Sequence, residues 1–454
     1  MLSAIKLTIF GTASFLFVFF GAFVVFRLLD KFKNLEKGFF HIMPYIILVV
    51  FALGTISSGR DFSNGVYESS GPAGWFHWVQ RLTTIILLLA SLERIINGFV
   101  HKRFNQPDFW PWLGVLFFFW FTTVFTSAVF SDHPQLNHEY FYPLVFFITA
   151  LFLSDQDKNA FIYSTRNALI VIVLLSWLFA LIKPSMVFHF GYSQGFIPGL
   201  PRFSGVAPHP VILSSLALLA GIFLMFKPFK SLLLNRFCWL LILLSIFMAQ
   251  SKTIWVMVAL FVFVYYLYIE AQLNLLRGKF SKNIMLKFVP LAGLALIMSV
   301  FFILFIGLDQ LIGQEKLEQL STLTGRDLIW AAVIEDAKFN SVFGYGPDYF
   351  KDLMSRIEDS AHMIHGHNQY YDTLAKAGQV GVVGLFLLTF YLIYKLIKVF
   401  SMKNSIFSFF IFLYLLIRSI SEIPLTYFGY TIDLIFLISL IILLRDRECP
   451  NITK

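Results

Sequence analysis

Residues 379–400 read QVGVVGLFLLTFYLIYKLIKVF, and this stretch decides the fold. Its side chains are almost all apolar, and no charged residue occurs before Lys395. An α-helix needs about 20 predominantly apolar residues to cross the hydrocarbon core of a bilayer. A membrane β-strand would instead alternate apolar and polar residues over about ten positions. The stretch therefore predicts a transmembrane helix.

Similar apolar runs recur along the whole chain, which has 454 residues and is 58% hydrophobic and 13% charged. Soluble domains average about 45–50% apolar and about 25% charged residues. The sequence predicts an all-α, polytopic integral membrane protein with about 12–13 transmembrane helices. The expected spans are 6–26, 39–56, 76–96, 110–130, 140–154, 168–183, 210–226, 237–250, 253–271, 288–308, 379–400, 406–424 and 429–444.

Basic residues indicate how the chain is oriented. They are frequent in alternate short loops and rare in the loops between, and loops rich in Lys and Arg face the cytoplasm. The net charge of +9 is explained in this way, without a nucleic-acid partner. We expect a transmembrane bundle with short loops over 1–308, a long helical periplasmic loop over 309–378, and transmembrane helices with a cytoplasmic tail over 379–454. A reaction outside the cytoplasm has no ATP supply, so its substrate must already be activated.

The long loop contains a helix start beside a cation. Thr324-Gly325-Arg326-Asp327 precedes an apolar stretch and is a variant of the capping pattern that begins helices. Arg326 then lies in the first turn, where an anion would be held by the guanidinium and by unpaired backbone N–H groups. Together with Arg202 and Lys252 at the same membrane face, it suits a lipid-linked phosphate. Snorkelling toward lipid headgroups is the alternative for each of the three.

The residues just before the opening span have local structural roles, with one exception. Asn368 is suited to cap a helix over 369–377, and Gly378 is suited to end it. A stripe of small residues at the start of the span, formed by Gly378, Gly381 and Gly384, allows close helix packing. His367 has no such role, and a histidine near neutral pKa can act as a general base. A metal site formed by His362, His365, His367 and Asp359 is the alternative, although their spacing matches no defined ligand pattern.

Several motifs over residues 200–385 resemble the O-antigen ligase/polymerase family of bacterial surface polysaccharide assembly. In chain order they are Arg202-Phe203-Ser204-Gly205 with His209-Pro210, Ser251-Lys252-Thr253, Thr324-Gly325-Arg326-Asp327 with Ile329-Trp330, Gly344-Tyr345-Gly346, and His367-Asn368 followed after nine residues by Gly378 and Gly381.

The resemblance implies a metal-independent glycosyltransferase without a cofactor, in the bacterial inner membrane with its active site on the periplasmic face. It would move a glycan from undecaprenyl diphosphate to an acceptor sugar hydroxyl, most simply as an O-antigen ligase that attaches O-antigen to lipid A-core in lipopolysaccharide biosynthesis. The resemblance assigns catalysis to His367, which engages the acceptor hydroxyl, and to Arg326, which holds the diphosphate. We expect Lys252, Arg202, Asn368, Ser251 and Tyr345 to bind the diphosphate and glycan. Lys252 replaces the usual arginine of the family, so the bidentate contact with phosphate is lost there.

Two other functions remain open at the level of the sequence. An O-antigen polymerase would join lipid-linked repeat units with the same chemistry. A transporter or flippase would place ionisable residues inside its spans, and such residues occur at Arg81, Glu93, Arg94, Arg418, Glu422 and Asp433. Arg418 and Glu422 are one helical turn apart and can simply pair. The absence of an internal repeat and the long polar loop count against transport.

Overall fold

The computed structural model describes residues 37–62, 71–190, 197, 199–276, 326–356, 365–399 and 405–445. Up to residue 190 its elements are η1 (Phe40–Ile42), α2 (Met43–Ser57), α3 (Phe76–Val100), η2 (Arg103–Asn105), α4 (Phe109–Trp120), η3 (Phe121–Phe125), α5 (Thr126–Phe130), η4 (His138–Phe141), α6 (Tyr142–Phe152), α7 (Asp155–Ile182), α8 (Pro184–Val187) and β1 (Phe188–His189). The later elements are β2 (Arg202–Phe203), α9 (Pro210–Phe226), α10 (Leu232–Ala249), α11 (Lys252–Leu276), α15 (Arg326–Ala337), α16 (Tyr349–Arg356), α17 (Gln369–Val399), α18 (Ser405–Ser421) and α19 (Ile432–Arg445).

The predicted all-α, multi-pass membrane protein is confirmed. In the described residues seven helices are long and apolar enough to cross a membrane, namely Phe40–Ser57, Phe76–Val100, Phe109–Phe130, Asp155–Ile182, Leu232–Ala249, Lys252–Glu270 and Gln369–Val399. Four further predicted spans form the shorter helices α6, α9, α18 and α19. The predicted spans at 6–26 and 288–308 lie outside the described residues.

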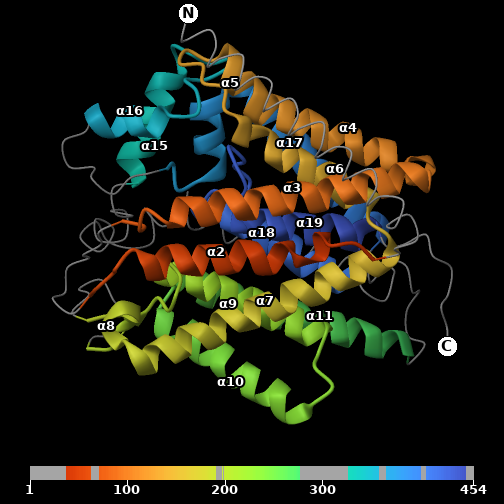
Figure 1. Cartoon of the computed structure of the whole chain (residues 1–454), viewed down its shortest axis with the longest axis vertical. Helices are drawn as coiled ribbons and strands as arrows, with labels where there is room; N and C mark the ends of the chain where they lie inside the picture. Colours follow the sequence, from red (N-terminus) through yellow and green to blue (C-terminus); the bar gives the residue numbers. More distant parts are fainter. Residues whose placement is uncertain are drawn as a thin grey trace, which may run out of the picture.

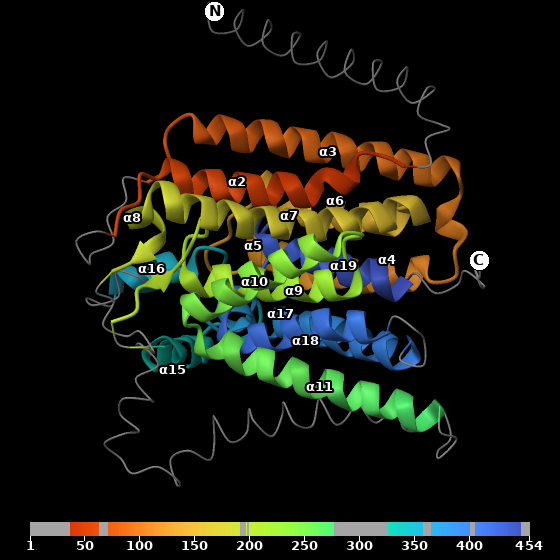
Figure 2. The same cartoon turned by 90° about the horizontal axis from the view of Figure 1, so that it is seen from below.

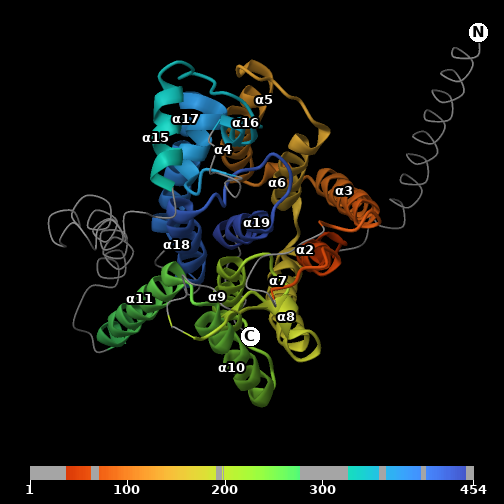
Figure 3. The same cartoon turned by 90° about the vertical axis from the view of Figure 1, so that its left-hand side faces the viewer.

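The long helices run side by side, and α8, α15 and α16 lie at the same end of the bundle (Figure 2). Figure 1 shows α17 beside α4 and α5. Viewed along the bundle, α19 is at the centre (Figure 3), and every residue from Leu434 to Ile442 is buried. A helix that is apolar on all sides is stable in such a position, since it has no face to present to water.

Helix α7 begins earlier than the predicted span at 168. Ser154 and Asp157 form a capping box, in which each side chain accepts a hydrogen bond from the backbone N–H of the other (3.1 Å each). The cap makes the polar first turns helical, although they lack the apolar pattern used to locate the span. Asp157 also accepts a 2.8 Å bond from Arg94, which contacts Glu93 as well. These ionisable residues of α3 therefore form a buried structural cluster at the start of α7.

The glycine stripe on α17 makes the predicted close helix contact, and its partner is the segment that joins α4 to α5. A Cβ atom on Gly384 would collide with Thr122 Oγ1, and one on Gly381 would lie 3.4 Å from the carbonyl oxygen of Thr122. Thr122 belongs to η3, a single π-helical turn. Two residues before the stripe, the carbonyl of Lys376 accepts a 2.6 Å hydrogen bond from Ser127 Oγ on α5. The small residues thus permit a close backbone approach between α17 and the first half of the chain.

A turn before α16 fills the break in α17. The helical backbone is interrupted at Gly378, whose φ is 60° and ψ −160°, so the predicted short helix over 369–377 is confirmed. The backbone N–H groups of Tyr345 and Gly346 donate to the carbonyls of Ala375 (2.8 Å) and Lys376 (3.1 Å). These are carbonyls that the broken helix leaves without an intrahelical partner.

The same turn is bound on its other side by the loop after α5. The N–H groups of Asp132 and His133 donate to the carbonyls of Gly344 (3.3 Å) and Tyr345 (3.1 Å). The segment around residue 345 therefore joins two parts of the chain that are far apart in sequence.

The orientation inferred from the basic loops can be tested with single cysteines. Lys351 on α16 is 73% exposed, and Lys230 before α10 is also exposed. We expect Lys351→Cys to react with an impermeant maleimide in intact spheroplasts, and Lys230→Cys to react only after permeabilisation, because residues 309–378 are predicted to be periplasmic. Both are made in a Cys449→Ser background, since Cys238 is buried. Protection of Lys351→Cys in intact cells would reverse the orientation.

Candidate active site

Two histidines and a carboxylate meet at the α15–α16 end of the bundle. His367 Nδ1 lies 3.6 Å from Glu422 Oε2, and His365 Nε2 lies 3.9 Å from the same oxygen. The two imidazole centroids are 4.1 Å apart. All three side chains are largely but not completely buried, with 18–28% of their surface exposed. The predicted base is thus beside a carboxylate that the sequence analysis did not assign to the site.

The loop that carries the histidines has an unusual backbone. His367 has a φ of 46°, in the left-handed region that non-glycine residues rarely adopt. Its N–H donates to His365 Nδ1 (3.2 Å), and the N–H of Gly366 donates to Asp372 Oδ1 (3.2 Å). Such strained residues occur often at functional sites, where the surrounding structure holds them in place.

Asn368 caps α17, as predicted. Its Oδ1 accepts hydrogen bonds from the N–H groups of Tyr370 (2.9 Å) and Tyr371 (3.3 Å). Its Nδ2 donates to the carbonyl of Ile420 in α18 (3.1 Å). One side chain therefore fixes the start of α17 and ties it to the helix that precedes Glu422.

Two more buried polar residues of α17 hold the connection between α18 and α19. Gln369 Oε1 accepts a 2.7 Å bond from the N–H of Leu425. Thr426 Oγ1 donates to Asp372 Oδ2 (3.1 Å). Since Asp372 also holds the loop of the histidines, these bonds fix the position of Glu422 relative to His367.

The ionisation of Glu422 suits a role beside a base. Burial alone would raise the pKa of this carboxyl, but adjacent His367 and the charge of Arg418 outweigh burial and lower the pKa to about 2. An ionised carboxylate facing Nδ1 favours the tautomer that carries its proton there, which leaves Nε2 as the proton acceptor. The 3.6 Å separation is slightly longer than a hydrogen bond, and such bonds often shorten when substrate binds.

The predicted pairing of Arg418 with Glu422 is incomplete. Arg418 Nη1 donates to Ser215 Oγ on α9 (2.6 Å), and its Nε lies 3.5 Å from Asp433 Oδ1 on α19. Arg418 therefore joins three helices behind the site while its charge still favours ionised Glu422.

His365, His367 and Glu422 could also hold a metal ion. Their ligand atoms all lie within 4.8 Å of one another, and two imidazoles with one carboxylate are ligand types that zinc accepts. His362 and Asp359, which the sequence analysis also considered, lie outside the described residues. The metal hypothesis therefore involves Glu422 in place of those two.

The burial of His365 predicts a loss of stability in acid. Desolvation, followed by the charge of His367, lowers the pKa of His365 from 6.5 to about 4. Below pH 6.5 the unfolded chain binds a proton that the folded state does not, so the free energy of unfolding falls by up to about 1.4 kcal/mol per pH unit until about pH 4. Thermal unfolding at pH 7.5 and pH 5 should show a smaller drop for His365→Gln than for the wild type. Equal drops would contradict a neutral, buried His365.

A cavity of about 1530 Å³ lies among α2, α3, α9 and the connection between α18 and α19, and His365, His367 and Glu422 are not among its described lining residues. It is lined by Ile423, the residue after Glu422, and by Lys376, which pairs with Asp372 at 3.0 Å. Its apolar lining residues are, among others, Ile47, Val50, Phe51, Ile85, Leu88, Ile212 and Leu216. Polar and charged side chains such as Ser215, Arg418 and Asp433 line it as well, so the cavity is amphipathic.

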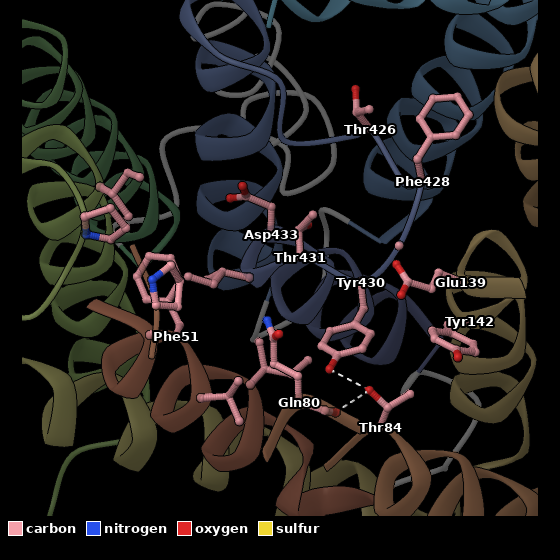
Figure 4. A pocket seen from close by; sticks show the side chains of 18 of the residues that line it. Phe51, Gln80, Thr84, Glu139, Tyr142, Thr426, Phe428, Tyr430, Thr431 and Asp433 are labelled. Carbon is pink, nitrogen blue, oxygen red and sulfur yellow. Dashed lines mark hydrogen bonds between the residues drawn. The ribbon is translucent and has the colours of Figure 1, made fainter. Parts of the chain in front are cut away.

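Aromatic and acidic side chains form one polar wall (Figure 4). The rings of Tyr142 and Tyr430 are 6.3 Å apart, and Tyr430 Oη is 2.9 Å from Thr84 Oγ1. Glu139 and Phe428 line the same cavity. Flat rings beside hydroxyl and carboxylate groups can bind both the apolar faces and the polar edges of a ligand.

The structure places three predicted binding residues together at the turn between α10 and α11. Arg202 is buried and its Nε donates to the carbonyl of Ala249 (3.2 Å). Ser251 is buried, whereas Lys252 is exposed as the first residue of α11. None of the three lines the cavity in the described part of the chain.

The remaining predicted residues are Tyr345 and Arg326. Tyr345 Oη donates to the carbonyl of Asp336 (3.0 Å). Helix α15 begins at Arg326, close to the predicted helix start, although the side chain of Arg326 lies outside the described residues. Trp330 attaches α15 to the site, since its Nε1 donates to the carbonyl of Gly366 (2.8 Å).

Sequence reasoning missed Glu422, Asp372 and Gln369 as parts of this site. Their signal was present, because ionisable and amide side chains at the ends of apolar spans are unusual and often functional. Their partners, however, lie in loops outside their own helices, and tertiary packing brings them together.

Comparison with known families adds a finding to this geometry. Residues 237–388 match the family model Wzy_C, described as O-Antigen ligase. The match includes both histidines of the cluster and the start of α17, whereas Glu422 lies beyond it. No curated protein matches the chain. Over these residues the match supports the predicted resemblance to the O-antigen ligase/polymerase family.

Proposed function

Because residues 237–388 carry an O-antigen ligase family domain, we propose that this membrane protein is a glycosyltransferase that uses undecaprenyl diphosphate-linked glycan at the periplasmic face of a bacterial inner membrane. The proposed acceptor is a sugar hydroxyl of lipid A-core, so the product is complete lipopolysaccharide. The same site would serve a polymerase if the acceptor were another lipid-linked repeat unit.

The contact between His367 and Glu422 at 3.6 Å is the observation that carries this proposal. The carboxylate of Glu422 keeps a proton on Nδ1 of His367, and Nε2 of His367 takes the proton of the acceptor hydroxyl. The acceptor oxygen then forms a bond to the anomeric carbon of the donor glycan while the bond from that carbon to the diphosphate oxygen breaks. The electron pair leaves with the diphosphate, and ionised Glu422 stabilises the imidazolium.

The amphipathic cavity supports a lipid-linked donor. Its apolar part suits an isoprenoid chain, and the wall formed by Tyr142, Tyr430, Phe428 and Glu139 suits a sugar. In this proposal Arg326, Arg202 and Lys252 stabilise the diphosphate from outside the described cavity. No metal or cofactor is required, because cations can stabilise a diphosphate leaving group directly.

A deletion strain tests the proposal through the surface glycan it makes. Loss of all polymer linked to lipid A-core on a gel, with restoration by the wild-type gene, is the result expected for a ligase. A single repeat unit attached to the core would identify a polymerase instead. An unchanged surface glycan would refute both reactions and leave transport to be tested.

A further inference from the structure

Four basic side chains line the cavity, namely Arg60, Arg81, Lys376 and Arg418. Lys376 and Arg418 lie next to the carboxylates of Asp372 and Asp433. Protein groups therefore already compensate these two charges.

Arg60 is also engaged by the protein. It is 1% exposed, and its guanidinium donates to the carbonyls of Met186 (2.9 Å), Ala207 (2.6 Å) and Gly205 (2.5 Å). The bonds anchor the loop before α9, so Arg60 has few donors left for a ligand.

Arg81 differs from the other three. Its guanidinium lies over the ring of Trp78 at 5.3 Å, and among the described residues it makes no hydrogen bond or ion pair. It is exposed, and it lines the cavity together with His77, one turn earlier on α3, and Gln80. A guanidinium at a cavity wall whose donors bind no described residue is a site for an anion, above all a phosphate, which it can bind through two parallel hydrogen bonds.

The position of Arg81 on α3 indicates the direction from which the anion comes. Trp75 and Trp78 on the same part of the helix are 52% and 64% exposed, and exposed tryptophans are typical of the headgroup level of a bilayer. Farther along the helix, Leu82 and Leu89 are also exposed, as expected for a lipid-facing surface. Arg81 is therefore at the edge between the cavity and the surrounding lipid, at the depth of phosphate groups.

We propose that Arg81, with His77 and Gln80, forms an anion subsite that receives the diphosphate of the lipid-linked donor as it enters the cavity from the bilayer. This inference rests on the proposed function, because it takes the donor to be a lipid diphosphate. Arg81 acts in binding and not in the transfer step, so its loss raises the KM for the donor and leaves kcat unchanged. Bulk lipid phosphate has the same chemistry and is the competing source.

The test measures binding of farnesyl diphosphate to the full-length protein in phosphatidylcholine nanodiscs. We expect Arg81→Ala to weaken binding by about tenfold, as for the loss of one charge-assisted contact, and Arg81→Lys to recover part of it. Arg236→Ala, which removes an exposed arginine on α10 away from the cavity, should bind like the wild type. Equal thermal unfolding temperatures show that each variant is folded.

Each other outcome refutes the subsite in a recognisable way. Equal affinity of wild type and Arg81→Ala for farnesyl diphosphate excludes it while leaving the proposed function intact. If Arg81→Ala loses as much affinity for farnesol, which has no phosphate, Arg81 maintains the shape of the cavity and does not bind an anion. A change seen only in nanodiscs with phosphatidylglycerol assigns Arg81 to bulk headgroups. If the wild type does not bind farnesyl diphosphate at all, the proposed donor is refuted together with the subsite.

Discussion

His367→Ala is expected to lower glycan transfer by about 10²–10⁴-fold, the effect of removing one positioned proton acceptor. The variant should still insert and fold, since the hydrogen bonds that fix this loop come from Asn368, Asp372 and the backbone of Gly366. The measurement is an in vitro assay with lipid-linked donor and purified acceptor. Full activity in His367→Ala would remove this residue from the reaction.

Variants of His365 and Glu422 distinguish a role of His367 as a base from a role as a metal ligand. His365→Ala should lose much less activity, because His365 lies outside the motifs that resemble the family and its Nδ1 accepts a hydrogen bond from the backbone of His367. A chelator should not affect the wild type. Equal losses in His365→Ala, His367→Ala and Glu422→Gln, together with sensitivity to the chelator, would assign the cluster to a metal ion instead.

Gly378→Ala should destabilise the protein by at least about 2 kcal/mol. With a φ of 60° and a ψ of −160°, Gly378 has a backbone conformation that costs a residue with a side chain about 1–3 kcal/mol. In addition, a Cβ atom there would collide with the carbonyl of Val342 and lie 2.6 Å from the nitrogen of Gly344. Both neighbours are backbone atoms, so no rotamer change relieves the clash. Thermal unfolding in detergent measures the effect.

Gly114→Ala is the matched control for this substitution. Gly114 is inside α4, and an added Cβ would meet nothing within 4 Å. Replacing a helical glycine with alanine usually stabilises a helix, by up to about 1 kcal/mol. We therefore expect an unchanged or higher unfolding temperature. If Gly378→Ala and Gly114→Ala unfold at the same temperature, the break in α17 is not a constraint.

The sequence predicted those parts of the site that depend on neighbouring residues. The cap at Asn368, the helix end at Gly378 and the packing of Gly384 follow from local rules of helix termination and helix contact, and all three are present. The carboxylate beside His367 could not be predicted in this way. Glu422 directly follows α18, 55 residues farther along the chain, and its position depends on contacts such as that of Gln369 with Leu425, which only the folded bundle creates.

The turn around residue 345 also constrains the order in which the protein can be assembled during synthesis. Ser127 and the N–H groups of Asp132 and His133 bind carbonyls of Lys376, Gly344 and Tyr345, which the ribosome makes much later. In the nascent chain, α5 and the loop after it therefore lack these hydrogen bonds, although the first helices have already inserted. These hydrogen bonds form in the same step that positions His367. A chain truncated before α17 therefore lacks both the contact of Ser127 with α17 and the active site.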